Sequence, residues 1–260
     1  MKAKDLSTHP PIICLVGPAG CGKTALCSQA GGGYLFDFDD GMRTALNLKD
    51  QFTSYRQQIE FDTYRDMDIR KPNAWLNAKN KLMQFVNTAD PVKHLVYDDK
   101  KTSFDSVVVD SLTGACQSIR YFVMNTEGGG PLNTPQIQHW GSMVKELDQF
   151  LCMLRSLPVV KIVAAHDNFA DVNDSIKHII NSMTKNHGMN NVSWMFDEVL
   201  YMQIKPAGEG KRKFIVTGKG AGLPVRTRSA IFDDVDITTI GLVGFLEKCG
   251  YVYNQKIVSH

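Results

Sequence analysis

Short apolar runs alternate with longer segments of helical periodicity along the first three quarters of the chain. Four runs rich in β-branched and aromatic residues have the character of buried strands: 11–17, 34–38, 105–110 and 158–166. Segments 73–87 and 134–157 repeat apolar residues at helical spacing, and we expect Thr134 to be the N-cap of the second helix and Pro135 its first residue. Because strands alternate with helices, the pattern predicts an α/β fold with a mainly parallel central sheet.

The pattern changes after about residue 196. Runs 196–204, 211–218 and 225–232 look like strands but are separated by glycine and charge instead of helices, which predicts an antiparallel extension of the sheet. A short helix is expected within 236–250. No internal repeat or low-complexity segment divides the chain, so we expect a single domain over 1–260 with a core at about 11–235.

Composition indicates an ordinary globular protein. The 260 residues are 43% hydrophobic and 22% charged, and the net charge is only +2. No apolar run approaches the length of a membrane span, and the first residues lack the apolar centre of a signal peptide. We therefore expect a cytoplasmic protein without a membrane partner.

The sequence GPAGCGKT at 17–24 matches the P-loop pattern and stands between a predicted strand and a predicted helix. In such a loop backbone N–H groups surround phosphate oxygens, Lys23 reaches the β- and γ-phosphates, and the hydroxyl of Thr24 binds Mg²⁺. The residues expected to hold the nucleotide are Gly17, Pro18, Ala19, Gly20, Cys21, Gly22, Lys23, Thr24 and Ala25. The alternative is a glycine turn with a surface lysine.

Carboxylates follow two other predicted strands. Asp110 ends the run SVVVD and is a candidate Mg²⁺ ligand, directly or through water, with Ser111 beside it. Asp37, Asp39 and Asp40 lie at the end of the second strand, where the carboxyl ends of parallel strands line a ligand crevice. The alternative for the second group is an acidic turn that caps the next helix.

Taken in order, GPAGCGKT, DFDDG, VVVDSLTGA, HWGSMVKEL and IVAAHD resemble the RecA-type ATPase core. Over about residues 11–235 the chain is most similar to compact phage-type (Sak4-like) single-strand annealing ATPases. The resemblance implies ATP hydrolysis with Mg²⁺ on Asp110, and it implies that Asp39 orients or deprotonates the attacking water. Asp40 is the rival for that role, and the resemblance nominates His166 as the residue that senses the γ-phosphate.

The resemblance also implies single-stranded DNA and further copies of the chain as partners. Loops predicted at 124–135 and 166–194 correspond in position to the DNA-contacting loops of the family. Seven basic residues and one acid between Lys205 and Arg228 give a local net charge of +6, which can face nucleic acid, a neighbouring triphosphate or solvent. RecA-type cores commonly take a cation from an adjacent subunit, and the candidates are Lys219, Arg226 and Arg228, the last two on one face of a predicted strand.

Two other functions are compatible with a P-loop. The first is a small-molecule kinase, which transfers the phosphate to a metabolite. The second is a nucleotide-gated binding module with little hydrolysis. The predicted third strand and antiparallel tail argue against the kinase.

Overall fold

The structure is a computed structural model, and it describes residues 10–88, 95–97, 100–102, 105–172, 175–184, 187, 192–208, 212–220, 222–229 and 233–251. Across those ranges, none of the helices combines the length and the apolar character that crossing a membrane requires.

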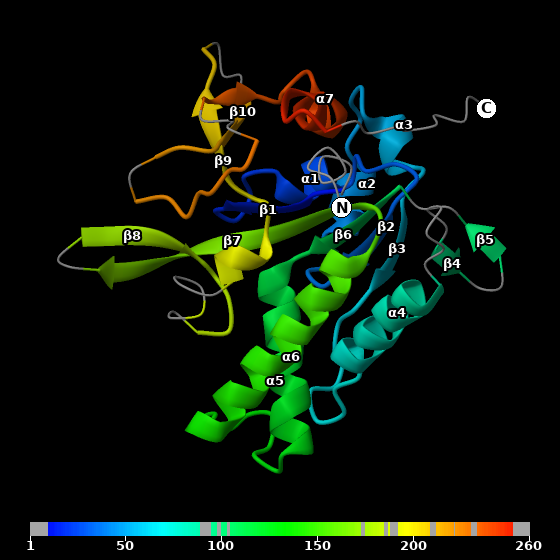
Figure 1. Cartoon of the computed structure of the whole chain (residues 1–260), viewed down its shortest axis with the longest axis vertical. Coiled ribbons are helices and arrows are strands. Elements are labelled where there is room, and N and C mark those ends of the chain that lie inside the picture. Colours follow the sequence, from blue (N-terminus) through cyan, green and yellow to red (C-terminus); the bar gives the residue numbers. More distant parts are fainter. Residues whose placement is uncertain are drawn as a thin grey trace, which may run out of the picture.

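One twisted sheet of nine strands forms the centre of the molecule (Figure 1). Its order is β11-β10-β9-β1-β7-β6-β2-β3, with β8 paired to β7 outside this path. The strands are β1 (Ile12–Gly17), β2 (Tyr34–Asp37), β3 (Glu60–Thr63), β6 (Ser106–Asp110), β7 (Val160–Val172), β8 (Ser175–Ile180), β9 (Glu198–Pro206), β10 (Arg212–Thr217) and β11 (Val235–Asp236). The six strands from β9 to β3 are parallel, whereas β10 and β11 run antiparallel, so the predicted α/β fold is confirmed. A separate pair joins β4 (Leu95–Tyr97) to β5 (Lys100–Thr102).

Helices cover both faces of the sheet (Figure 1). One face carries α4 (Ala74–Thr88), α5 (Leu112–Thr126) and α6 (Ile137–Ser156), which pack on alternate residues of the strands in a core that includes Trp75 and Phe150. The other face carries α1 (Lys23–Cys27), α2 (Met42–Leu46), α3 (Thr53–Arg56) and α7 (Gly241–Lys248). A 3-10 turn, η3 (Val192–Met195), precedes β9. The sheet therefore has a hydrophobic core on each face. Side chains alternate between the two faces of a strand, and both faces are covered by helices.

Three local predictions are wrong. Helix α6 begins at Ile137 instead of Pro135, because Gln136 is its N-cap and His139 completes a capping box by accepting the Gln136 N–H at 3.0 Å. The segment 166–194 is not one loop, because β7 continues to Val172 and pairs with β8 in a hairpin. Within 222–229 the expected strand is replaced by a single bridge between Arg226 and Val199, while residues 230–232 lie outside the described ranges.

The carboxyl ends of β1, β2 and β6 meet at one edge of the sheet, where β7 runs on beyond them. Gly17 of β1 is in register with His166 of β7, and Asp37 of β2 is in register with Asp110 of β6. Ligands of open parallel sheets bind outside such an edge. The fold therefore brings the P-loop, the candidate metal carboxylate and the acidic turn together.

Candidate functional site

The P-loop closes around the ammonium group of Lys23. Its Nζ donates hydrogen bonds to the carbonyl oxygens of Gly17 and Pro18, both at 2.8 Å, and only 5% of the residue is exposed. Gly22 has a φ of 96°, a conformation that favours glycine, and it leads directly into α1. A lysine that already lies inside the loop can move its hydrogen bonds to phosphate oxygens when a triphosphate enters.

Thr24 and Asp110 form a small oxygen-rich site beside the loop. The Thr24 side chain hydrogen-bonds the Asp110 carboxylate, yet Asp110 Oδ2 is buried without a hydrogen-bond partner. Burial raises the pKa of Asp110 to about 6, and the Thr24 hydrogen bond opposes that rise only in part. A buried oxygen without a partner next to a threonine hydroxyl is the donor set that a hard cation such as Mg²⁺ uses, so these residues fit the metal.

Gly41 lies directly against this metal site. A Cβ atom at Gly41 would lie 2.9 Å from Thr24 Cγ2, 3.2 Å from Thr24 Oγ1 and 3.5 Å from Asp110 Oδ2. The absence of a side chain here therefore leaves room between the acidic turn and the P-loop.

Gly41→Ala is expected to weaken Mg²⁺ binding by roughly tenfold, because the added methyl group crowds the cation site at an overpacking cost. Titration of Mg²⁺ at saturating nucleotide measures the effect. Gly141→Ala is the matched control, since a Cβ atom at Gly141 would meet nothing within 4 Å. Equal Mg²⁺ affinity in the two variants would contradict the assignment.

The three carboxylates after β2 have three different environments. Asp37 is fully buried and accepts the backbone N–H groups of Gly41 at 3.0 Å and Met42 at 3.1 Å, so it caps the turn before α2. Asp39 accepts a 2.6 Å hydrogen bond from Ser111 Oγ. Asp40 has a φ of 57° and turns instead toward two arginines. The helix-capping alternative thus describes Asp37, whereas Asp39 faces the strand end that carries Asp110.

Asp39 and His166 approach one another across the site. His166 Nε2 lies 3.5 Å from Asp39 Oδ2, and the His166 backbone N–H donates to Thr113 Oγ1 at 3.1 Å. Burial alone would raise the pKa of Asp39, but hydrogen bonds from His166 and Ser111 outweigh burial and hold the pKa below its usual value. Asp39 is therefore an ionised carboxylate at neutral pH, held in place by Ser111 after β6 and by His166 of β7.

The positive charges of the basic segment 205–228 are largely paired with acids, although the sequence suggested an uncompensated charge. Acids that precede or follow it in sequence pair with four of its seven cations: Lys205 with Asp234, Lys213 with Asp236, Lys219 with Asp233, and Arg228 with Asp197. Lys211 lies outside the described residues. Surface pairs of this kind lower the local field that would attract a polyanion.

Arg226 and Arg228 lie far from the P-loop of their own chain. Arg226 bridges Val199 and Arg228 pairs with Asp197, both at the amino end of β9. Since β9 runs parallel to β1, that end belongs to the edge of the sheet opposite the P-loop. Neither arginine reaches the nucleotide site within one chain.

Sequence patterns missed several residues of the site. Arg43 and Arg65 carry charge close to the acidic turn, and Thr113 orients the backbone of His166. Arg43 lies three residues after Asp40, which is a helical spacing that signals an ion pair. Arg65 follows β3, far from Asp40 in sequence, and no local pattern points to it.

The family comparison agrees with this geometry. A family model described as an AAA domain matches residues 9–229, which include the P-loop, the acidic turn, Asp110 and His166. No curated protein matches the chain. The match covers most of the 260 residues, and proteins of this kind bind nucleotides, typically with Mg²⁺. The chain therefore belongs to the AAA-domain family of P-loop NTPases.

Proposed function

We propose that the chain is a Mg²⁺-dependent ATPase of RecA type that acts on single-stranded DNA in phage-type recombination, repair or replication in the cytoplasm. One observation carries the ATPase assignment: the ionised Asp39 carboxylate, hydrogen-bonded to Ser111 and 3.5 Å from His166, stands beside the P-loop and the Asp110 cation site. This arrangement combines phosphate binding with a group that orients water.

Each side chain of the site has one task in this proposal. The P-loop residues Gly17 to Ala25 hold the triphosphate, with Lys23 on its outer phosphates. Thr24 and Asp110 hold Mg²⁺, which would neutralise charge on the phosphate oxygens. Asp39 orients the attacking water, and His166 contacts the γ-phosphate from the middle of β7 and reports its presence to the hairpin that follows.

The β7–β8 hairpin supports a DNA partner. It continues from His166 beyond the sheet (Figure 1), and Phe169 on it is 53% exposed. The Phe169 ring packs against the His178 ring at 4.6 Å, so the hairpin presents an aromatic surface on which bases can stack. The loop after α5, which was also expected to contact DNA, lies at the far ends of α5 and α6 and not beside this hairpin (Figure 1).

The DNA proposal is tested by ATP turnover with and without single-stranded DNA. We expect DNA to increase the rate of phosphate release, and Phe169→Ala to remove that increase while the DNA-free rate stays at the parent level. Identical rates with and without DNA, together with no DNA binding in the presence of ATP, would overturn the DNA assignment. Labelled phosphate found on a metabolite instead of in water would indicate a kinase.

We also propose a homo-oligomer, as a ring or filament, in which Arg226, Arg228 or Lys219 serves a neighbouring site. Arg226 and Arg228 lie away from the P-loop edge, so head-to-tail stacking would bring them to the next subunit. Mixing an Arg226→Ala, Arg228→Ala chain with a Lys23→Ala chain should recover part of the ATPase activity. No recovery in mixtures shown to co-assemble would argue against this role.

A further inference from the structure

The nucleotide site holds more negative than positive charge. Four carboxylates gather at the strand ends: Asp37, Asp39, Asp40 and Asp110. Lys23 is the buried cation of the P-loop. A bound triphosphate adds more negative charge than one Mg²⁺ and one lysine neutralise. Further positive charge near the phosphates would therefore favour binding and turnover.

Two arginines stand next to this acidic group, both paired with Asp40. Arg43 Nε lies 3.1 Å from Asp40 Oδ1, and Arg65 Nη1 lies 3.8 Å from Asp40 Oδ2. Their side chains are 83% and 64% exposed, so both guanidinium groups remain largely hydrated. Exposed ion pairs contribute little free energy, and a more highly charged phosphate competes well for the same arginines.

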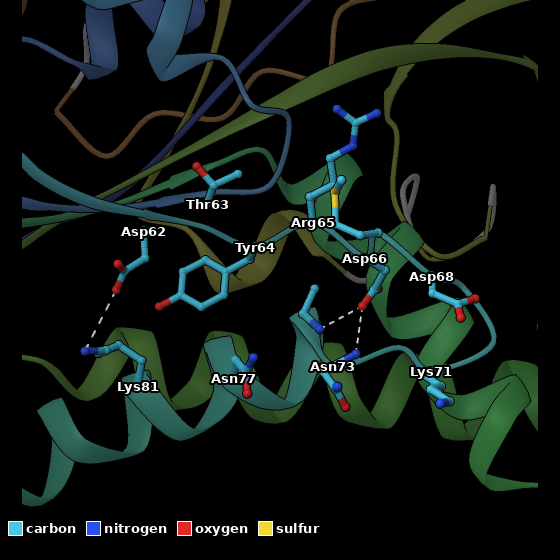
Figure 2. A pocket seen from close by; sticks show the side chains of 12 residues that line it. Asp62, Thr63, Tyr64, Arg65, Asp66, Asp68, Lys71, Asn73, Asn77 and Lys81 are labelled. Atoms are coloured by element: carbon cyan, nitrogen blue, oxygen red, sulfur yellow. Dashed lines mark hydrogen bonds and ion pairs between the residues drawn. The ribbon is translucent and has the colours of Figure 1, made fainter.

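Arg65 comes from the segment after β3 that forms one side of a polar cavity of about 500 Å³ (Figure 2). Asp66 and Asp62 in this cavity are held by partners on or before α4, namely the Asn73 backbone and Lys81. Figure 2 shows the Arg65 side chain directed away from α4, unlike Asp62 and Asp66. Arg65 therefore faces the acidic turn and does not belong to the network of hydrogen bonds and ion pairs on α4.

Asp40 lies close to the nucleotide site, because the residues before and after it both contact that site. Asp39 bonds Ser111 next to Asp110, and Gly41 lies against Thr24. Consecutive Cα atoms are about 3.8 Å apart, so Asp40 is close to the cation site as well. Its φ of 57° is unfavourable for a residue with a side chain, and the hydrogen bonds that Asp37 accepts from the turn maintain it.

We propose that Asp40 holds Arg43 and Arg65 at the mouth of the nucleotide site and that both guanidinium groups move onto the terminal phosphates when MgATP binds. They then stabilise negative charge on the γ-phosphate within the same chain. The role of Asp40 is to position the arginines, which separates it from the water-orienting role of Asp39. The effect on turnover rests on the proposed ATPase function, whereas the effect on ATP affinity does not.

The test compares an Arg43→Ala, Arg65→Ala double variant with the parent chain. We expect ATP affinity to fall at least about tenfold, because charge-assisted contacts to phosphate are lost. ADP affinity should stay within about threefold of the parent, because ADP lacks the γ-phosphate. Turnover should fall by about a hundredfold or more. Calorimetric titration and phosphate release measure these quantities.

Arg70→Ala is the matched control, since Arg70 is an exposed arginine of the same segment that pairs with Asp68. It should leave both affinities and turnover at the parent level. Arg65→Lys in the Arg43→Ala background should restore part of the ATP affinity, and an unchanged thermal unfolding midpoint shows that the fold is intact.

Parent-like discrimination between ATP and ADP in the folded double variant would overturn the proposal. An equal loss for ATP and ADP would also overturn it, because the arginines would then not act on the γ-phosphate. If the parent chain binds ATP but releases no phosphate, the ATPase function fails, and the comparison of ATP with ADP still decides the role of the arginines.

Discussion

Lys23→Ala is expected to lower ATP affinity by at least about a hundredfold and to abolish turnover. The Lys23 ammonium group lies inside the P-loop, 2.8 Å from the carbonyl oxygens of Gly17 and Pro18, and is almost fully buried. Alanine removes a charge that would bind two phosphates at once, and it leaves those carbonyl oxygens facing the triphosphate.

Calorimetric titration with MgATP measures the loss of affinity directly. Lys248→Ala is a suitable control, because Lys248 is an exposed lysine at the end of α7, outside the site. Parent-like ATP binding by a folded Lys23→Ala chain would show that the loop is only a glycine turn.

Asp39→Asn should keep ATP affinity near the parent value and reduce turnover by a factor of about a hundred or more. Asparagine preserves the shape and can still accept the hydrogen bond that Ser111 donates at 2.6 Å. It removes the negative charge that hydrogen bonds from His166 and Ser111 maintain at neutral pH. This variant should therefore bind ATP like the parent but hydrolyse it much more slowly.

The matched variant is Asp40→Asn, which weakens the hold on Arg43 and Arg65 without altering Asp39. We expect a smaller loss of turnover than for Asp39→Asn, because Asp40 only positions Arg43 and Arg65 and both arginines are still present. A parent-like Asp39→Asn chain with an inactive Asp40→Asn chain would move the catalytic role by one residue. Parent activity in both would exclude a carboxylate of this turn.

Local signals in the sequence were sufficient for the P-loop and for the strand that ends at Asp110. Both depend on a few consecutive residues. Glycines allow the backbone conformation of the P-loop, and a run of β-branched residues favours the buried strand. The acidic turn was located from the same kind of signal. The different environments of its three carboxylates were not predictable, because Asp37, Asp39 and Asp40 differ only in the partners that the fold supplies.

Long-range pairing explains what the sequence did not reveal. The β7–β8 hairpin is formed by strand pairing within a polar segment that lacks the apolar pattern of a buried strand, so 166–194 looked like a loop. The cations of the C-terminal segment looked uncompensated because Asp233, Asp234 and Asp236 follow the segment in sequence and return beside it through β10 and β11. Arg65 likewise reaches Asp40 from the segment after β3, because β3 pairs with β2.

The proposed ATPase function is tested most directly by phosphate release from ATP by the purified chain, with Mg²⁺ present and with Mg²⁺ removed by a chelator. We expect steady phosphate release that requires Mg²⁺ and is lost in both Lys23→Ala and Asp39→Asn. Tight ATP binding without phosphate release, with or without single-stranded DNA, would contradict this function and would indicate a binding module that uses the nucleotide only as a ligand.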